Sequence, residues 1–138
     1  MASSEVEIVN SALVKIGEAP IVSLTEDREQ ARVANRQYSL KRDELLRRYR
    51  WNFAIKRATL APDATKPDFG FQNRFLMPSS CLRVIGLYDD RELKRNYTAT
   101  RKSWKVEGRY ILSDTDVLRI FYLDRITDPT QFDPLFAE

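Results

Sequence analysis

A stretch from residue 23 to residue 60 contains neither proline nor glycine, and it constrains the fold more than any other part of the chain. It opens with a capping box, in which the Ser23 hydroxyl can accept a helix N–H while the Glu26 carboxylate reaches back. Good helix formers dominate up to about residue 49, which predicts one long helix over residues 25–49. Apolar residues then alternate along Trp51, Phe53 and Ile55, which predicts a strand.

The rest of the chain predicts one more full helix and several short strands. Val6, Val9, Leu13 and Ile16 form an apolar stripe at helical spacing, which predicts a helix over residues 4–17 that Gly17 ends. Short apolar runs separated by turn residues extend over a β-rich region at about residues 51–126. These patterns predict an α+β protein, with an antiparallel pair of helices packed against an antiparallel β-meander.

The C-terminal residues indicate the start of a further helix at about residues 133–138. Asp133 is a candidate N-cap, with Pro134 at the first helical position. So short a helix is not stable alone, so we expect either a truncated helix or docking on a neighbour. The residues predicted to make this protein contact are Phe132, Leu135 and Phe136.

Composition limits the class of protein. The 138 residues, 43% hydrophobic and 31% charged, are typical of a single soluble globular domain spanning residues 1–138. No apolar run approaches the roughly 18 residues of a membrane span, so no membrane association is predicted. The single cysteine, Cys81, has no histidine partner because the chain has none, and it is predicted to be a buried structural thiol.

Basic residues are concentrated between residues 91 and 109, a segment that contains seven basic residues and only two acidic residues. This segment also contains Tyr97 and Trp104. Such a surface could face DNA phosphates, an acidic partner or water. The residues chosen for a DNA or acidic-partner surface are Lys94, Arg95, Arg101, Lys102 and Lys105.

Catalytic signals are weak. Histidine is absent, the four glycines are scattered, and no phosphate-binding loop is present. Asp114 and Asp116 could act as an acid/base pair or bind a metal, with Asp124 and Asp128 further on. A turn between two strands requires the same residues, and we interpret them as a turn. No cofactor or metal is predicted, and the chain is predicted not to be an enzyme.

Several stretches in this order resemble the phage tail tubular protein A family, the head-to-tail adaptors (gatekeepers) of short-tailed phages and prophages. They lie at residues 5–21, 42–57, 76–84, 106–114 and 128–136, and the last includes Phe132-Asp133-Pro134-Leu135-Phe136. The resemblance implies a virion structural protein, a helical bundle that carries a β-rich insertion. It also implies a ring, usually dodecameric, between the portal protein and the tail nozzle protein, with transient non-specific DNA contact as the genome passes through.

This resemblance implies a location at the head–tail junction of the virion, with the host cytoplasm as the site of assembly. Family chains generally continue past the Phe132–Phe136 motif with further helices, which is consistent with a truncated chain here. Two other functions remain open. A small DNA-binding prophage protein would show steep salt-dependent affinity for DNA, and a carboxylate-based polysaccharide hydrolase would lose activity without Asp114 and Asp116.

Overall fold

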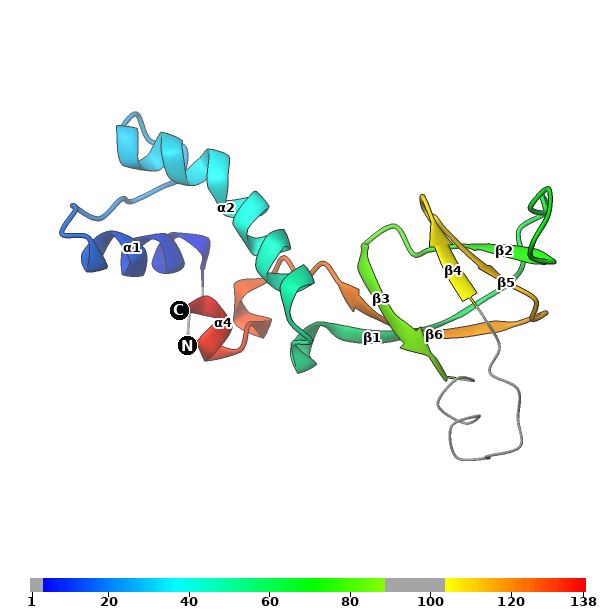
Figure 1. Ribbon diagram of the computed structural model, residues 1–138. Helices are drawn as coiled ribbons and strands as arrows, with labels where there is room; N and C mark the ends of the chain where they lie inside the picture. The colour runs from blue at the N-terminus through cyan, green and yellow to red at the C-terminus, as the bar shows by residue number, and fades with distance from the viewer. Residues whose placement is uncertain (1–3, 89–103) are drawn as a thin grey trace. The chain divides into compact units, whose positions relative to one another are not determined.

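The computed structural model describes residues 4–88 and 104–138, in which helices and antiparallel strands confirm the α+β class (Figure 1). The chain divides into two compact units. The helical unit comprises Met1–Ala54 and Arg125–Glu138, and the sheet unit comprises Ile55–Asp124. None of the described helices is long and apolar enough to cross a membrane.

Two helices form most of the helical unit. α1 spans Glu5–Lys15, and the Ser4 hydroxyl caps it by accepting the Glu7 N–H at 3.2 Å. α2 spans Glu29–Arg48 and runs back in roughly the opposite direction (Figure 1). Leu13, Ile21 and Ala31 form a small buried core between the helices and their connection. The Asn10 side chain fixes this connection, because its amide oxygen accepts the Ile21 N–H at 2.8 Å and its amide nitrogen donates to the Ile21 carbonyl at 3.0 Å.

The predicted start of the second helix is wrong by several residues. The Glu26 carboxylate does reach back, accepting the Val22 and Ser23 N–H groups at 3.0 and 3.4 Å. The Ser23 hydroxyl, however, accepts the N–H of Thr25 instead of the N–H three residues on. These bonds close a turn in the connection, and α2 begins only at Glu29.

The predicted strand at residue 51 is also corrected. Asn52–Ala54 form a short 3-10 helix, η1, and the first strand starts at Ile55. The Trp51 indole N–H donates to the Leu45 carbonyl at 3.0 Å, which satisfies one of the unpaired carbonyls at the end of α2. The rings of Trp51 and Phe53 therefore belong to the helical unit.

Among the described residues of the sheet unit, six strands make two three-stranded antiparallel sheets. One sheet has the order β1-β6-β3 and the other β2-β5-β4, so the strands are antiparallel as predicted but do not follow the sequential order of a single meander. Their bounds are β1 Ile55–Leu60, β2 Asn73–Leu76, β3 Cys81–Leu87, β4 Trp104–Glu107, β5 Tyr110–Ser113 and β6 Leu118–Asp124. Residues from both sheets share one core, which includes Phe75, Ile111 and Ile120.

Local details of the sheet unit confirm several sequence predictions. Cys81 is buried with 3% of its surface exposed. Gly108 has a φ of 59° in the tight β4–β5 hairpin, where a residue with a side chain would be strained. Asp114 lies in the turn before β6, as predicted, and its carboxylate accepts the Gln72 N–H at 2.9 Å.

The end of the chain returns to the helical unit through two short helices. η2 spans Pro129–Gln131 and α4 spans Pro134–Ala137. The Asp133 carboxylate caps α4 by accepting the Leu135 N–H at 2.9 Å, with Pro134 at the first helical position as predicted.

Candidate interaction surfaces

An apolar groove lies between α1 and α2. Its volume is about 600 Å³, and α1 contributes Ile8, Val9 and Ala12 while α2 contributes Val33 and Ala34. Ala12 of α1 and Ala34 of α2 line the groove, and their small side chains leave space between the helices. A groove of this kind is a common docking site for an apolar segment of another protein.

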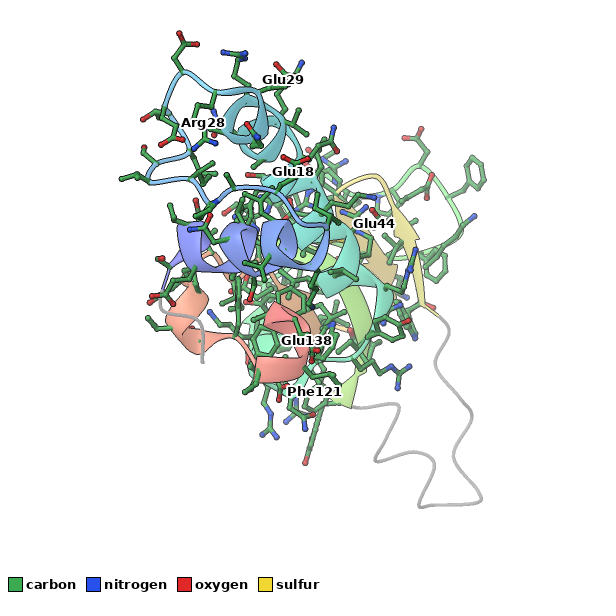
Figure 2. All side chains as sticks on the ribbon, turned by 90° about the vertical axis from the view of Figure 1, so that its left-hand side faces the viewer. Glu18, Arg28, Glu29, Glu44, Phe121 and Glu138 are labelled. Carbon is green, nitrogen blue, oxygen red and sulfur yellow. The ribbon has the colours of Figure 1, made fainter. Side chains whose placement is uncertain are left out.

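Charged and polar groups lie at the edges of this groove. Glu18, Gln30 and Glu29 line it near the start of α2, and Lys41 lines it further along α2. In Figure 2 both Glu18 and Glu29 lie above α1, with Glu29 farther from it. The Tyr38 hydroxyl is buried without a hydrogen-bond partner among the described residues. Burial raises the pKa of Tyr38, Glu5 raises it further, and Arg42 opposes the shift.

An aromatic cluster fixes the C-terminal segment to the helical unit. The Phe136 ring lies 5.1 Å from Trp51, 5.2 Å from Phe53 and 4.8 Å from Phe132, mostly edge to face. Phe132 and Phe136 are 2% and 7% exposed, whereas Leu135 is 69% exposed. Both phenylalanines thus pack within their own chain, and of the three predicted contact residues only Leu135 leaves most of its side chain exposed. A role of these residues in protein contact remains a prediction.

Of the five residues predicted to form a basic surface, only Lys105 is among the described residues. Lys94, Arg95, Arg101 and Lys102 lie outside the described residues. Lys105 is exposed on β4, opposite Leu112 of β5. Its role as part of a basic surface remains a prediction.

A second basic surface lies on the β1-β6-β3 sheet, and the sequence analysis did not find it. The guanidinium of Arg57 lies 5.1 Å from the centre of the Phe121 ring, and that of Arg119 lies 4.6 Å from the centre of the Tyr88 ring. The two rings are 6.4 Å apart. We call these four side chains the arginine–aromatic row. A hollow of about 280 Å³ adjoins them, and the described residues that line it include no acidic side chain.

Comparison with known protein families decides what kind of protein carries these surfaces. The family model described as tail tubular protein matches residues 6–118, which is most of the chain. The chain belongs to the tail tubular protein family. A comparison with curated proteins found no significant match.

Membership of the tail tubular protein family makes this chain a structural component of a phage tail. The match spans both units, from within α1 to the first residue of β6. It therefore includes the apolar groove, and Arg57 and Tyr88 of the arginine–aromatic row. In a structural protein of this family, these surfaces are candidates for contacts with other virion components.

The carboxylates of this tail tubular protein have structural contacts. Asp114 holds the chain before β2 through the Gln72 N–H, and Asp124 accepts from the Lys56 ammonium at 2.7 Å. The Asp124 hydrogen bond and its charge raise the pKa of Lys56, and burial followed by the Asp124 charge raises the pKa of Tyr122. Within residues 4–88 and 104–138, no group of three or more histidine, cysteine or acidic side chains is arranged to hold a metal ion.

Proposed function

We propose that this chain is a head-to-tail adaptor subunit of a tailed phage or prophage, without a catalytic role. In this proposal it assembles into a dodecameric ring between the portal protein and the tail nozzle protein, and the genomic DNA passes through the ring. The observation that carries the proposal is the family match over residues 6–118, because it assigns the chain to the phage tail.

The apolar groove supports assembly with other proteins. Val33, on its α2 side, is 44% exposed, and Ile16, at the end of α1, is 72% exposed. A monomer seldom leaves a contiguous apolar surface of this kind in water unless the surface binds a partner. Ring subunits need such surfaces because every copy contacts two neighbours.

Electron microscopy of the purified protein tests the assembly. The protein is imaged by negative stain alone and after mixing with the cognate portal protein. We expect rings that stack coaxially on the portal. A protein that stays monomeric and does not bind the portal at micromolar concentration contradicts the adaptor role.

A charge placed in the groove tests whether the groove makes these contacts. Val33→Glu puts a carboxylate on the α2 side of the groove, and we expect it to prevent ring formation or portal binding. Leu40→Glu is the matched control, because Leu40 is 65% exposed on the same helix and does not line the groove. Equal assembly by the two variants, with unchanged thermal unfolding, assigns the contacts to another surface.

The carboxylate hydrolase has no support from the site geometry. Asp114 accepts a backbone hydrogen bond that holds the chain before β2, and the exposed Asp116 lies in the same turn. A cleft with converging carboxylates is what that chemistry requires. Any hydrolytic activity that disappears in Asp116→Asn would restore the hypothesis.

A further inference from the structure

The arginine–aromatic row lies on one face of one sheet. In the β1–β6 pairing, Arg57 is opposite Phe121, and Thr59 is opposite Arg119. Directly opposite residues of antiparallel strands share a face, so both arginines and the Phe121 ring lie on the same side. Leu123, two residues along β6, is opposite Arg83 of β3, which places Arg83 on this face as well.

This face carries three arginines. No ion pair joins Arg57 or Arg83 to any acidic residue within the described ranges. The positive charge of these two guanidiniums is therefore not neutralised by a nearby described carboxylate. Arginine stays protonated at all physiological pH values, so the charge is permanent.

Arg74 provides a useful contrast within the same unit. Its guanidinium also lies on an aromatic ring, 4.0 Å from the centre of Tyr110. It forms an ion pair with the Asp63 carboxylate at 2.8 Å, so its charge is neutralised within the protein. Stacking alone therefore does not distinguish a binding arginine from a structural one. Arg57 differs from Arg74 because it combines a ring contact with no described carboxylate partner, and Arg83 is chosen because it lies on the same face.

The geometry favours a phosphate partner. Arg57 is exposed on a strand, and its contact with Phe121 limits the orientations of the planar guanidinium. A guanidinium stacked on a ring keeps its N–H edge available for two parallel hydrogen bonds to a phosphate. The Phe121 ring is only 7% exposed, so it is not available to stack on a nucleotide base. The face can therefore bind backbone phosphates without reading sequence.

We propose that the face of the β1-β6-β3 sheet bearing Arg57, Arg83 and Arg119 contacts the phosphate backbone of duplex DNA. This inference rests on the adaptor function proposed above, and it identifies the surface that faces the passing genome. Arg57 and Arg83, which have no described carboxylate partner, give a small number of phosphate contacts. Binding of this strength lets DNA pass, because each contact exchanges rapidly with salt ions.

The salt dependence of DNA binding tests the proposal. Affinity of the purified protein for a short random-sequence duplex is measured by fluorescence anisotropy across a salt series beginning at low ionic strength. Each phosphate contact adds about 0.9 to the slope of log affinity against log salt. We expect Arg57→Gln/Arg83→Gln to lower this slope by about 2 relative to wild type. Arg57→Lys/Arg83→Lys keeps both charges and should retain most of the slope.

The matched control removes the same charge from the other unit. Arg47→Gln/Arg50→Gln changes two exposed arginines of the helical unit, and its slope should equal that of wild type. Equal losses in the two glutamine variants would show a net-charge effect and overturn the proposal. Displacement of the duplex by polyglutamate as effectively, per charge, as by a second duplex would also overturn it, because the face would then accept carboxylates equally well.

The same measurements separate this proposal from the adaptor function. A wild-type slope corresponding to six or more phosphates is the range of dedicated DNA-binding proteins, and it would favour the DNA-binding prophage protein over the adaptor. Ring and portal assembly of the Arg57→Gln/Arg83→Gln variant should remain intact. If this variant assembles normally and its salt slope is lower than that of wild type, the phosphate contact is supported. If it assembles normally and its salt slope equals that of wild type, the phosphate contact is rejected and the adaptor function stands.

Discussion

Phe136→Ala tests whether the aromatic cluster holds the helical unit together. The Phe136 side chain contacts three other rings with centroid distances between 4.8 and 5.2 Å, and 7% of its surface is exposed. α4 has only four residues, so it cannot be stable without tertiary contacts. The free energy that retains α4 must therefore come largely from these ring contacts.

The magnitude follows from burial and ring geometry. Burying a phenylalanine side chain contributes about 1.5–3 kcal/mol, and each edge-to-face contact adds about 0.5–1.5 kcal/mol. These terms overlap, and measured Phe→Ala changes in cores amount to about 3–5 kcal/mol. We expect Phe136→Ala to lower the free energy of unfolding of the helical unit by that amount. Most domains are stable by about 5–15 kcal/mol, so the variant should be only marginally folded.

Tryptophan fluorescence during urea unfolding provides the assay. Trp51 lies in the helical unit and Trp104 in the sheet unit, so a Trp104→Phe background makes fluorescence report on the helical unit. Leu135→Ala is the control, because Leu135 is the neighbour of Phe136 on α4 and is 69% exposed. Its substitution should change the free energy of unfolding by less than about 0.5 kcal/mol.

Two results would refute this reasoning. A loss below about 1 kcal/mol for Phe136→Ala would place the rings outside a cooperative core, since core truncations cost several times more. A larger loss for Leu135→Ala than for Phe136→Ala would mean that α4 packs through its opposite face.

Two further predictions concern the sheet unit. Lys56→Met leaves the carboxylate of Asp124, whose side chain is 7% exposed, without its ammonium partner, and should cost about 1–3 kcal/mol in urea unfolding. Lys56→Met/Asp124→Leu should recover most of this loss. Since Asp124 raises the pKa of Lys56 above 10.5, the stabilisation is complete below the unfolded-state pKa and is lost as pH rises through the folded-state value. Wild type should therefore lose its advantage over Lys56→Met at strongly alkaline pH. Gly108→Ala should cost about 1–2 kcal/mol because its φ is 59°, whereas Gly86→Ala, with open space at the Cβ position, should change stability by less than about 0.5 kcal/mol in the same thermal or urea unfolding experiment.

Sequence patterns predicted elements well where the signal was local. The apolar stripe of α1, the hairpin at Gly108 and the cap at Asp133 each depend on residues within a few positions of one another. The alternation at Trp51 and Phe53 gave the wrong element because it does not reveal which partners the rings meet. Those partners, Phe132 and Phe136, lie about eighty residues further along the chain. Only the tertiary structure shows that four aromatic residues share one cluster.

The candidate DNA surface illustrates the same limit. A run of basic residues is visible in a sequence, and for that reason the DNA or acidic-partner surface was predicted within residues 91–109. Arg57, Arg83 and Arg119 lie on three separate strands, and Arg83 and Arg119 are each the only basic residue of a mostly apolar strand. A single arginine in an apolar strand indicates its solvent-facing side, which was the available signal. Strand pairing was needed to bring the three onto one face.

The way the sheet unit joins the rest of the chain has a consequence for engineering. The chain enters this unit at Ile55 and leaves it after Asp124, and Ile55 is opposite Leu123 in neighbouring strands. The Cα atoms of such a pair are about 4.5–5.5 Å apart, a gap that a few glycines can bridge. The whole unit can therefore be excised as a cassette, or exchanged for that of a related tail protein, while the helical framework keeps its own connections.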